Sequence, residues 1–114
     1  MTPASLLKDI AAAAMTMSPI STIRGYVFGS ILKPNFFWTD VDILIVCDDP
    51  ADVFNVRPAL ALVCYVAPID LLVMSASEEV ELDFVAAQGC QLLFKLSGEN
   101  SIVNYNDSLL SNAA

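Results

Sequence analysis

The chain of 114 residues contains no histidine, and its five Lys and Arg residues stand against thirteen Asp and Glu residues. The absence of histidine excludes Ser-His and Cys-His catalytic triads and a histidine general base. The net charge of -8 opposes binding to bulk nucleic acid. Any catalysis must therefore rest on carboxylates and on a cation that they bind.

Cysteines and long apolar runs are also few. Cys47, Cys64 and Cys90 are widely spaced in apolar surroundings, which predicts reduced thiols in a cytoplasmic protein and no zinc site. The longest uncharged runs, 10–23 and 58–69, are too short to span a bilayer, so we expect no membrane segment. Hydrophobic residues still make up 56% of the chain, which indicates that part of the surface meets a partner.

The hydrophobic pattern predicts helices that alternate with strands. This alternation predicts an α+β fold with α/β-like order, in which helices flank a mixed sheet of about four strands. We expect one domain over 1–114, with a loosely ordered polar tail over 97–114. The expected helices are 3–17, a single turn at 31–33, a helix within 51–63 that Pro58 kinks or restarts, and a helix from Ser75 or Ser77 to Gln88. The expected strands are 26–28, 41–47, the firm part 69–74 of an apolar run that begins at Cys64, and 91–96.

Two carboxylates, Asp40 and Asp42, stand at the start of the strongest apolar strand. Residues two apart on a strand share a face and lie roughly 6.6 to 6.8 Å apart along it. Such a pair without His or Cys suits Mg²⁺ or Mn²⁺ better than zinc. The alternative is that both are ordinary solvated carboxylates at the entrance of a strand.

Gly29 and Ser30 end the preceding strand in a tight turn. A strand, a glycine turn and a helix start present backbone N–H groups and a hydroxyl to an anion such as phosphate. The alternative is an ordinary turn, in which Gly29 supplies the backbone conformation that the turn requires and Ser30 caps the short helix.

Asp70 is a single carboxylate within an apolar strand. Its burial without a partner would be unfavourable, so something must compensate its charge. If this strand lies next to that of Asp42, the carboxylates converge on one patch where a cation would relieve their repulsion. Pairing with Arg24 or Arg57 is the structural alternative.

Taken together, the apolar-Gly29-Ser30 turn, the nine-residue spacer, Asp40-apolar-Asp42 and the later apolar-Asp70-apolar strand resemble the minimal nucleotidyltransferases of the DNA polymerase beta superfamily. The likeness extends over roughly residues 24–96 and includes the helix-to-strand passage at 88–94. The whole pattern is far more specific than any of its parts.

The resemblance implies that Gly29, Ser30 and Lys33 bind the nucleotide and that Asp40, Asp42 and Asp70 are catalytic and metal-binding. The cofactor would be Mg²⁺ or Mn²⁺, and the substrate ATP or another nucleoside triphosphate. It further implies transfer of a nucleoside monophosphate, AMP in the first instance, to a hydroxyl of a protein partner. Stand-alone members of this family often act as the antitoxin of a helical HEPN-type toxin.

The sequence departs from the family after Ser30, where many members carry an Arg-rich loop and this chain offers only Lys33. This departure supports an alternative, a weakly active or inactive nucleotidyltransferase-like subunit that binds a partner or forms a homodimer through an apolar surface. The aromatic run 36–38 stacks on a base, docks a partner or packs on the core, and the sequence leaves these three readings open.

Overall fold

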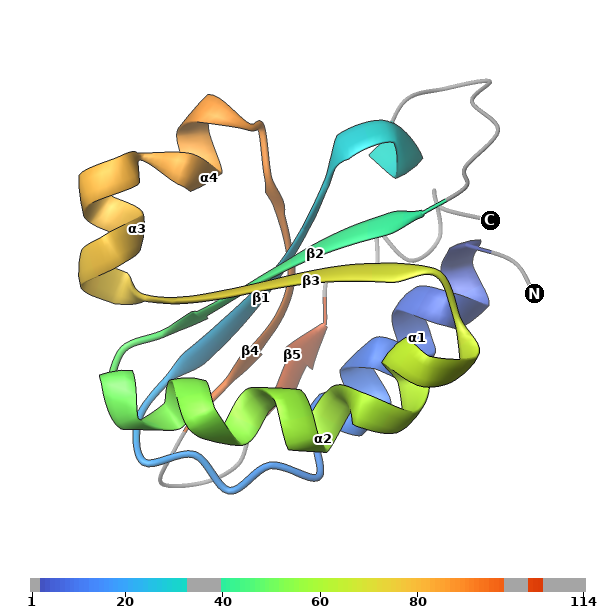
Figure 1. The fold of residues 1–114 in the computed structure, drawn as a ribbon, viewed down its shortest axis with the longest axis horizontal. Helices are drawn as coiled ribbons and strands as arrows, with labels where there is room; N and C mark the ends of the chain where they lie inside the picture. The colour runs from blue at the N-terminus through green and yellow to red at the C-terminus, as the bar shows by residue number, and fades with distance from the viewer. Residues whose placement is uncertain (1–2, 33–39, 98–102, 106–114) are drawn as a thin grey trace.

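A five-stranded mixed sheet organises the described residues, which in this computed structural model are 3–32, 40–97 and 103–105 (Figure 1). Its strand order is β3-β2-β1-β4-β5. Strand β1 is antiparallel to β2 and β4, and β5 is antiparallel to β4, whereas β2 and β3 are parallel. The predicted α+β fold with a mixed sheet is confirmed. The strands are β1 (Ile23–Phe28), β2 (Val41–Cys47), β3 (Ile69–Ser75), β4 (Gln91–Leu96) and β5 (Val103–Tyr105).

Helices cover both faces of the sheet. Helices α1 (Pro3–Ala14) and α2 (Val53–Val66) lie together on one face, and the short helices α3 (Ala76–Leu82) and α4 (Phe84–Ala87) lie on the other (Figure 1). Two 3₁₀ turns, η1 (Gly29–Leu32) and η2 (Pro50–Asp52), follow β1 and β2. None of the described helices has the length and apolar character that crossing a bilayer requires.

Strand β2 is apolar on both faces because both are covered. Val41, Ile43 and Ile45 pack in the larger core beneath α1 and α2. Leu44 and Val46 pack in a smaller core with residues of α3 and α4. Among the residues of β2, only Asp42 is not buried. The sheet therefore exposes this carboxylate at the open end of an otherwise buried strand.

The predicted second helix is longer at its C-terminal end than the sequence indicates. Helix α2 continues through Val66, so Cys64–Val66 are helical and do not begin the strand that the apolar run predicts. Pro58 lies inside α2 without ending it. Pro58 is exposed, and it removes the N–H that would otherwise donate to the carbonyl of Phe54.

The predicted single helix over 75–88 is divided into α3 and α4. Ser75 caps α3 through a reciprocal capping box with Glu78, as expected from a Ser three residues before a Glu. Asp83 then adopts a left-handed conformation with φ 50° and interrupts the helix. Strand β5 falls within the segment that the sequence predicts as a tail.

The three cysteines have free thiols, as the sequence predicts. Cys47 is buried, and this burial, with the nearby charges of Asp52 and Asp48, raises the pKa of its thiol to about 12. Its sulfur is therefore protonated at neutral pH and serves packing.

Gly25 yields a first prediction, because the buried ring of Phe94 occupies the space that a β-carbon at this position would need. Overpacking of this kind lowers stability by about 1–3 kcal/mol, so Gly25→Ala should lower the free energy of unfolding by that amount. In the double variant with Phe94→Leu, the loss should be smaller than the sum of the two single losses. Urea denaturation gives the free energy of unfolding of the wild type, the two single variants and the double variant. Additive losses would contradict the contact between Gly25 and Phe94.

Candidate active site

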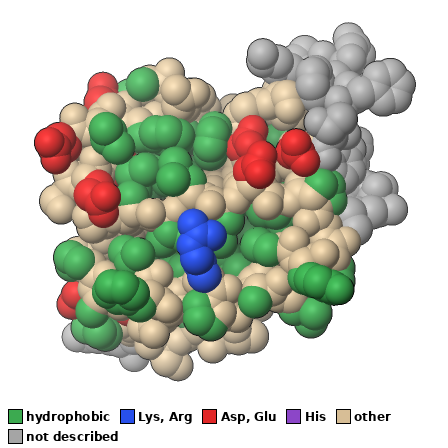
Figure 2. Space-filling model, viewed as in Figure 1, with side chains coloured by type: hydrophobic (Ala, Val, Ile, Leu, Met, Phe, Trp, Pro, Cys, Tyr) green, Lys and Arg blue, Asp and Glu red, His purple; other side chains and the backbone are tan. Residues whose placement is uncertain are grey.

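Asp42 and Asp70 lie side by side at the end of the sheet where β2 and β3 begin. They are direct register partners in the parallel pairing of these strands, so their side chains share one face on strands about 4.8 Å apart. This is the face opposite α1 and α2, because Asp42 alternates with Val41 and Ile43. Figure 2 shows acidic side chains gathered at this end of the molecule.

The glycine turn and the acidic pair form one site. Gly29 has φ 82°, and a β-carbon on it would collide with Oδ2 of Asp42. The backbone of the turn therefore lies directly against the Asp42 carboxylate. Ile31 and Leu32 of η1 pack against the larger core, which holds Gly29 and Ser30 in place.

The charge of the acidic pair is not compensated by a basic side chain among the described residues. Burial raises the pKa of Asp42, and the charge of Asp70, a hydrogen bond with the Asp70 carboxyl group and the charge of Asp40 raise it further.

The alternative that Asp70 is compensated by an ion pair with Arg24 or Arg57 is wrong. Arg24 pairs with Asp48 at 2.7 Å. Arg57 donates a hydrogen bond of 3.3 Å to the carbonyl oxygen of Leu71.

Asp40 lies outside the strand pairing that brings Asp42 and Asp70 together. It is exposed and directly precedes β2. Within the described ranges, no group of three or more His, Cys, Asp or Glu side chains is arranged to hold a metal ion. The structure thus brings together two of the three predicted ligands, while Asp40 contributes charge from the start of the strand.

Phe28 is a site residue that the sequence analysis did not single out. It is paired with Asp42 across β1 and β2, and its ring makes an edge-to-face contact with Phe84 of α4, at 5.2 Å between centroids and 86° between planes. The side chain beside Asp42 on this face is therefore an aromatic wall. The position of Phe28 directly before Gly29 was the available signal. Lys33 and the aromatic run 36–38 lie outside the described residues.

The sequence matches no model of a known protein family and no curated protein. Among solved structures it is similar to the solution NMR structure of NF4, a de novo designed protein with a novel fold. The two are 13% identical, and the match covers 96% of this chain and 79% of that chain with a TM-score of 0.41. At that score the likeness carries no argument about fold or function.

The close approach of Gly29 to Asp42 predicts an unequal effect of two glycine substitutions. Gly29 and Gly89 both have positive φ, but a β-carbon at Gly89 would meet nothing within 4 Å. Gly89→Ala should therefore lower the free energy of unfolding by about 1–2 kcal/mol from backbone strain alone. Gly29→Ala should lower the free energy of unfolding further, by an additional amount on the order of 0.5–1.5 kcal/mol, because the methyl group forces the Asp42 carboxylate out of its rotamer. Equal losses in urea denaturation would contradict the contact.

The raised pKa of Asp42 predicts how stability depends on pH without metal. The folded protein binds this proton more tightly than the unfolded chain, so ionisation of Asp42 destabilises the fold and stability falls as pH rises above the ordinary carboxyl pKa near 3.8. In EDTA, Asp42→Asn should melt at a higher temperature than the wild type at pH 7. The difference should vanish well below pH 3.8, where Asp42 of the wild type is protonated in both the folded and the unfolded protein. A lower melting temperature at pH 7 would refute the repulsion.

Proposed function

We propose that this protein is a Mg²⁺-dependent nucleotidyltransferase that transfers a nucleoside monophosphate, with ATP as the expected donor, to a hydroxyl group of a protein partner. One observation carries the proposal: Asp42 and Asp70 are register neighbours, and the Asp42 carboxylate lies against the Gly29 turn. An anion-binding turn and a cation-binding pair are then joined in a single site. This is the arrangement that the resemblance to minimal nucleotidyltransferases implies.

The donor set fits a divalent cation. Two neighbouring carboxylates that repel each other, with no basic partner among the described side chains, are best relieved by a hard cation that prefers oxygen ligands. Asp42 and Asp70 would hold Mg²⁺ or Mn²⁺, with Asp40 adding charge. When bound, the cation neutralises charge that develops on the phosphate oxygens during transfer.

Other residues of the site would bind the phosphates, accept the proton and exclude water. The Gly29 turn and the Ser30 hydroxyl would bind phosphate oxygens, and Lys33, the next basic residue along the sequence, would add positive charge. Asp70 is exposed, so its carboxylate is accessible to the acceptor and would accept the proton of the attacking hydroxyl. The hydroxyl oxygen would then bond to the α-phosphorus, and pyrophosphate would leave. Phe28 and Phe84 would close one side of the site against water.

The acceptor is assigned by the resemblance and by charge. The net charge of -8 opposes RNA as acceptor. We therefore favour a tyrosine, serine or threonine hydroxyl of a protein. A HEPN-type toxin in a cytoplasmic toxin–antitoxin pair is the expected partner.

A second function is favoured by the incomplete carboxylate group. Only two of the three predicted ligands are brought together in the described structure. The chain also lacks the Arg-rich loop that many relatives of this type carry after Ser30. Both features support a subunit that binds a nucleotide weakly, or not at all, and acts through protein contacts.

The two functions are separated by incubating the protein with ATP labelled at the α-phosphate, Mg²⁺ and the product of an adjacent gene, where a HEPN-type partner is expected. Wild type should bind ATP and transfer label to protein, and Asp42→Asn and Asp70→Asn should each reduce transfer at least about 100-fold, or about 2.7 kcal/mol. Asp83→Asn is the matched control. Asp83 is exposed and left-handed, a conformation that Asn also tolerates.

Metal-dependent binding of ATP without transfer would favour the inactive subunit. Equal transfer by wild type and Asp42→Asn would contradict the assignment of this site. Absence of both ATP binding and transfer would overturn the nucleotidyltransferase proposal.

A further inference from the structure

Helix α2 is apolar on its solvent side as well as on its buried side. Val56, Leu60 and Val63 are buried in the larger core. On the opposite side, Phe54 is 82% exposed, Leu62 75% and Tyr65 88%. A helix that is apolar all round is normally buried on all sides. We name these three residues, with the exposed Pro58 between them, the α2 stripe.

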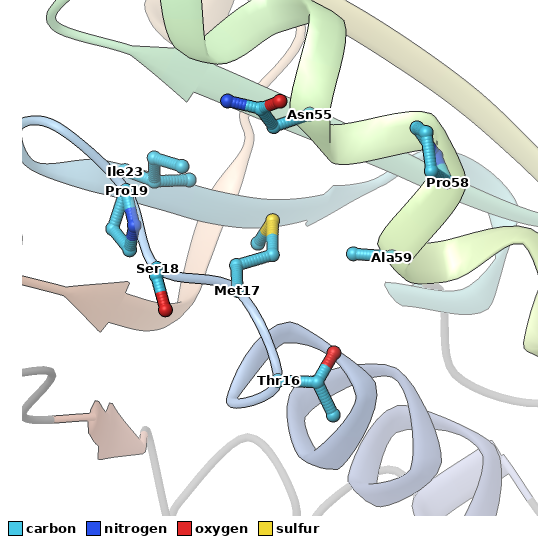
Figure 3. A pocket seen from close by; sticks show the side chains of 8 residues that line it. All are labelled: Thr16, Met17, Ser18, Pro19, Ile23, Asn55, Pro58 and Ala59. Atoms are coloured by element: carbon cyan, nitrogen blue, oxygen red, sulfur yellow. The ribbon is translucent and has the colours of Figure 1, made fainter.

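A pocket of about 520 Å³ opens beside the α2 stripe. Figure 3 shows that its walls come from two facing segments, the connection between α1 and β1 and the first half of α2, with Met17 pointing into the space between them. Its lining contains no charged residue. The lining residues are Thr16, Met17, Ser18, Pro19, Ile23, Asn55, Pro58 and Ala59.

The wall opposite α2 is fixed before any partner binds. The buried carboxylate of Asp52 accepts hydrogen bonds from the backbone N–H groups of Ile20, at 2.9 Å, and Ser21, at 3.1 Å. The Ser21 hydroxyl in turn accepts a hydrogen bond of 2.8 Å from the backbone of Asp49. The connection is thereby tied to the turn that precedes α2. The pocket is a preformed feature of the surface.

A protruding aromatic ring and a pocket thus adjoin each other on one surface. Residues four apart on a helix lie about 6 Å apart, so Phe54 stands next to Pro58, which lines the pocket. A two-fold axis between the ring and the pocket would place the Phe54 ring of each copy in the pocket of the other, as isologous contacts require. The volume is ample, because a cavity of about 150 Å³ accommodates a benzene ring.

The charge distribution favours a second copy on this face. The chain carries a net charge of -8, so two copies repel wherever carboxylates face one another. Helix α2 contains no carboxylate, and its one charged residue, Arg57, is turned to the Leu71 carbonyl on β3. The α2 stripe and the pocket lining therefore contribute no carboxylate of their own to a contact between two copies of this acidic protein.

The exposed area is of the right order for such a contact. Phe and Tyr bury about 150–250 Å² each when covered, so the α2 stripe exposes several hundred Å² of apolar surface. A stable interface buries at least about 1,000 Å² in total, or about 500 Å² from each partner. We propose that the protein forms a symmetric homodimer in which Phe54 of each chain enters the pocket of the other and the two α2 stripes pack together. This inference is independent of the acidic site, which lies at the other end of β1.

Sedimentation velocity on the full chain tests the proposal. Wild type should be dimeric at micromolar concentration, and added NaCl should strengthen the dimer because it screens the repulsion between two acidic chains. Phe54→Ala should weaken dimerisation at least tenfold, since buried aromatic anchors dominate interfaces. Val80→Ala removes an equally prominent apolar side chain, 77% exposed on α3, and should leave the dimer unchanged.

A mixing experiment tests the specific fit. Asn55→Trp, at an exposed position of the pocket lining, should fill the pocket and also weaken the homodimer. A mixture of Phe54→Ala and Asn55→Trp should associate more strongly than either alone, because one intact ring then meets one open pocket. Circular dichroism confirms that both variants are folded.

A wild type that is monomeric at every concentration and salt overturns the proposal, even if a different protein binds the α2 stripe. Dimerisation of Phe54→Ala with unchanged affinity also overturns it. A mixture no stronger than its components refutes the insertion of Phe54.

Discussion

The parallel pairing of β2 with β3 determines the position of the other features of this molecule. Parallel neighbours cannot be joined by a hairpin, so the chain must cross over one face of the sheet, and α2 is that crossover. The same pairing sets Asp42 beside Asp70. One connection therefore creates the acidic pair on one face and leaves the outer side of α2 exposed on the other.

The repulsion between the carboxylates of Asp42 and Asp70 is unfavourable, and the packing of the surrounding core offsets it. All residues of β2 other than Asp42 are buried, and Ile31 and Leu32 hold the turn that presses Gly29 against this carboxylate. The side chains are thus fixed in a repulsive arrangement by packing that they do not influence. Strained or repulsive arrangements maintained in this way are typical of functional sites.

Much of the fold follows from sequence because local and tertiary preferences agree. Strands 41–47 and 91–96 match their apolar patterns, and Ser75 caps α3 through its own local chemistry. Prediction from sequence fails where a contact between residues far apart in the chain determines the local structure. Gly25 resembles a turn residue but lies within β1, because the ring of Phe94 fills the space above it.

Other differences have the same origin. Cys64–Val66 resemble a strand and remain helical because the larger core holds Val63 and Cys64 against the sheet. The interruption at Asp83 lies in an acidic run that resembles a continuous helix. Asp52 has no local signature, since its partners, Ile20 and Ser21, lie about thirty residues earlier.

The site shows the same division between local and distant information. The residue types at Gly29, Asp42 and Asp70 indicate chemistry, but their convergence depends on register, and a shift of one residue would turn Asp70 into the core. From the sequence, the adjacency of Asp42 and Asp70 could be predicted only on the assumption that their strands are neighbours. The sequence could not predict the position of Asp40, because this residue lies just before β2 and the pairing of β2 with β3 does not fix it.

The two surfaces lie on opposite sides of the sheet, and this separation has a functional consequence. Asp42 and Asp70 face the side of α3 and α4, whereas the α2 stripe forms the outer surface of the helical layer on the other side. Packing of two α2 stripes would cover neither the acidic pair nor the Gly29 turn. Each copy in the proposed dimer would then leave its acidic pair open, so self-association need not compete with the proposed nucleotidyl transfer for the same surface.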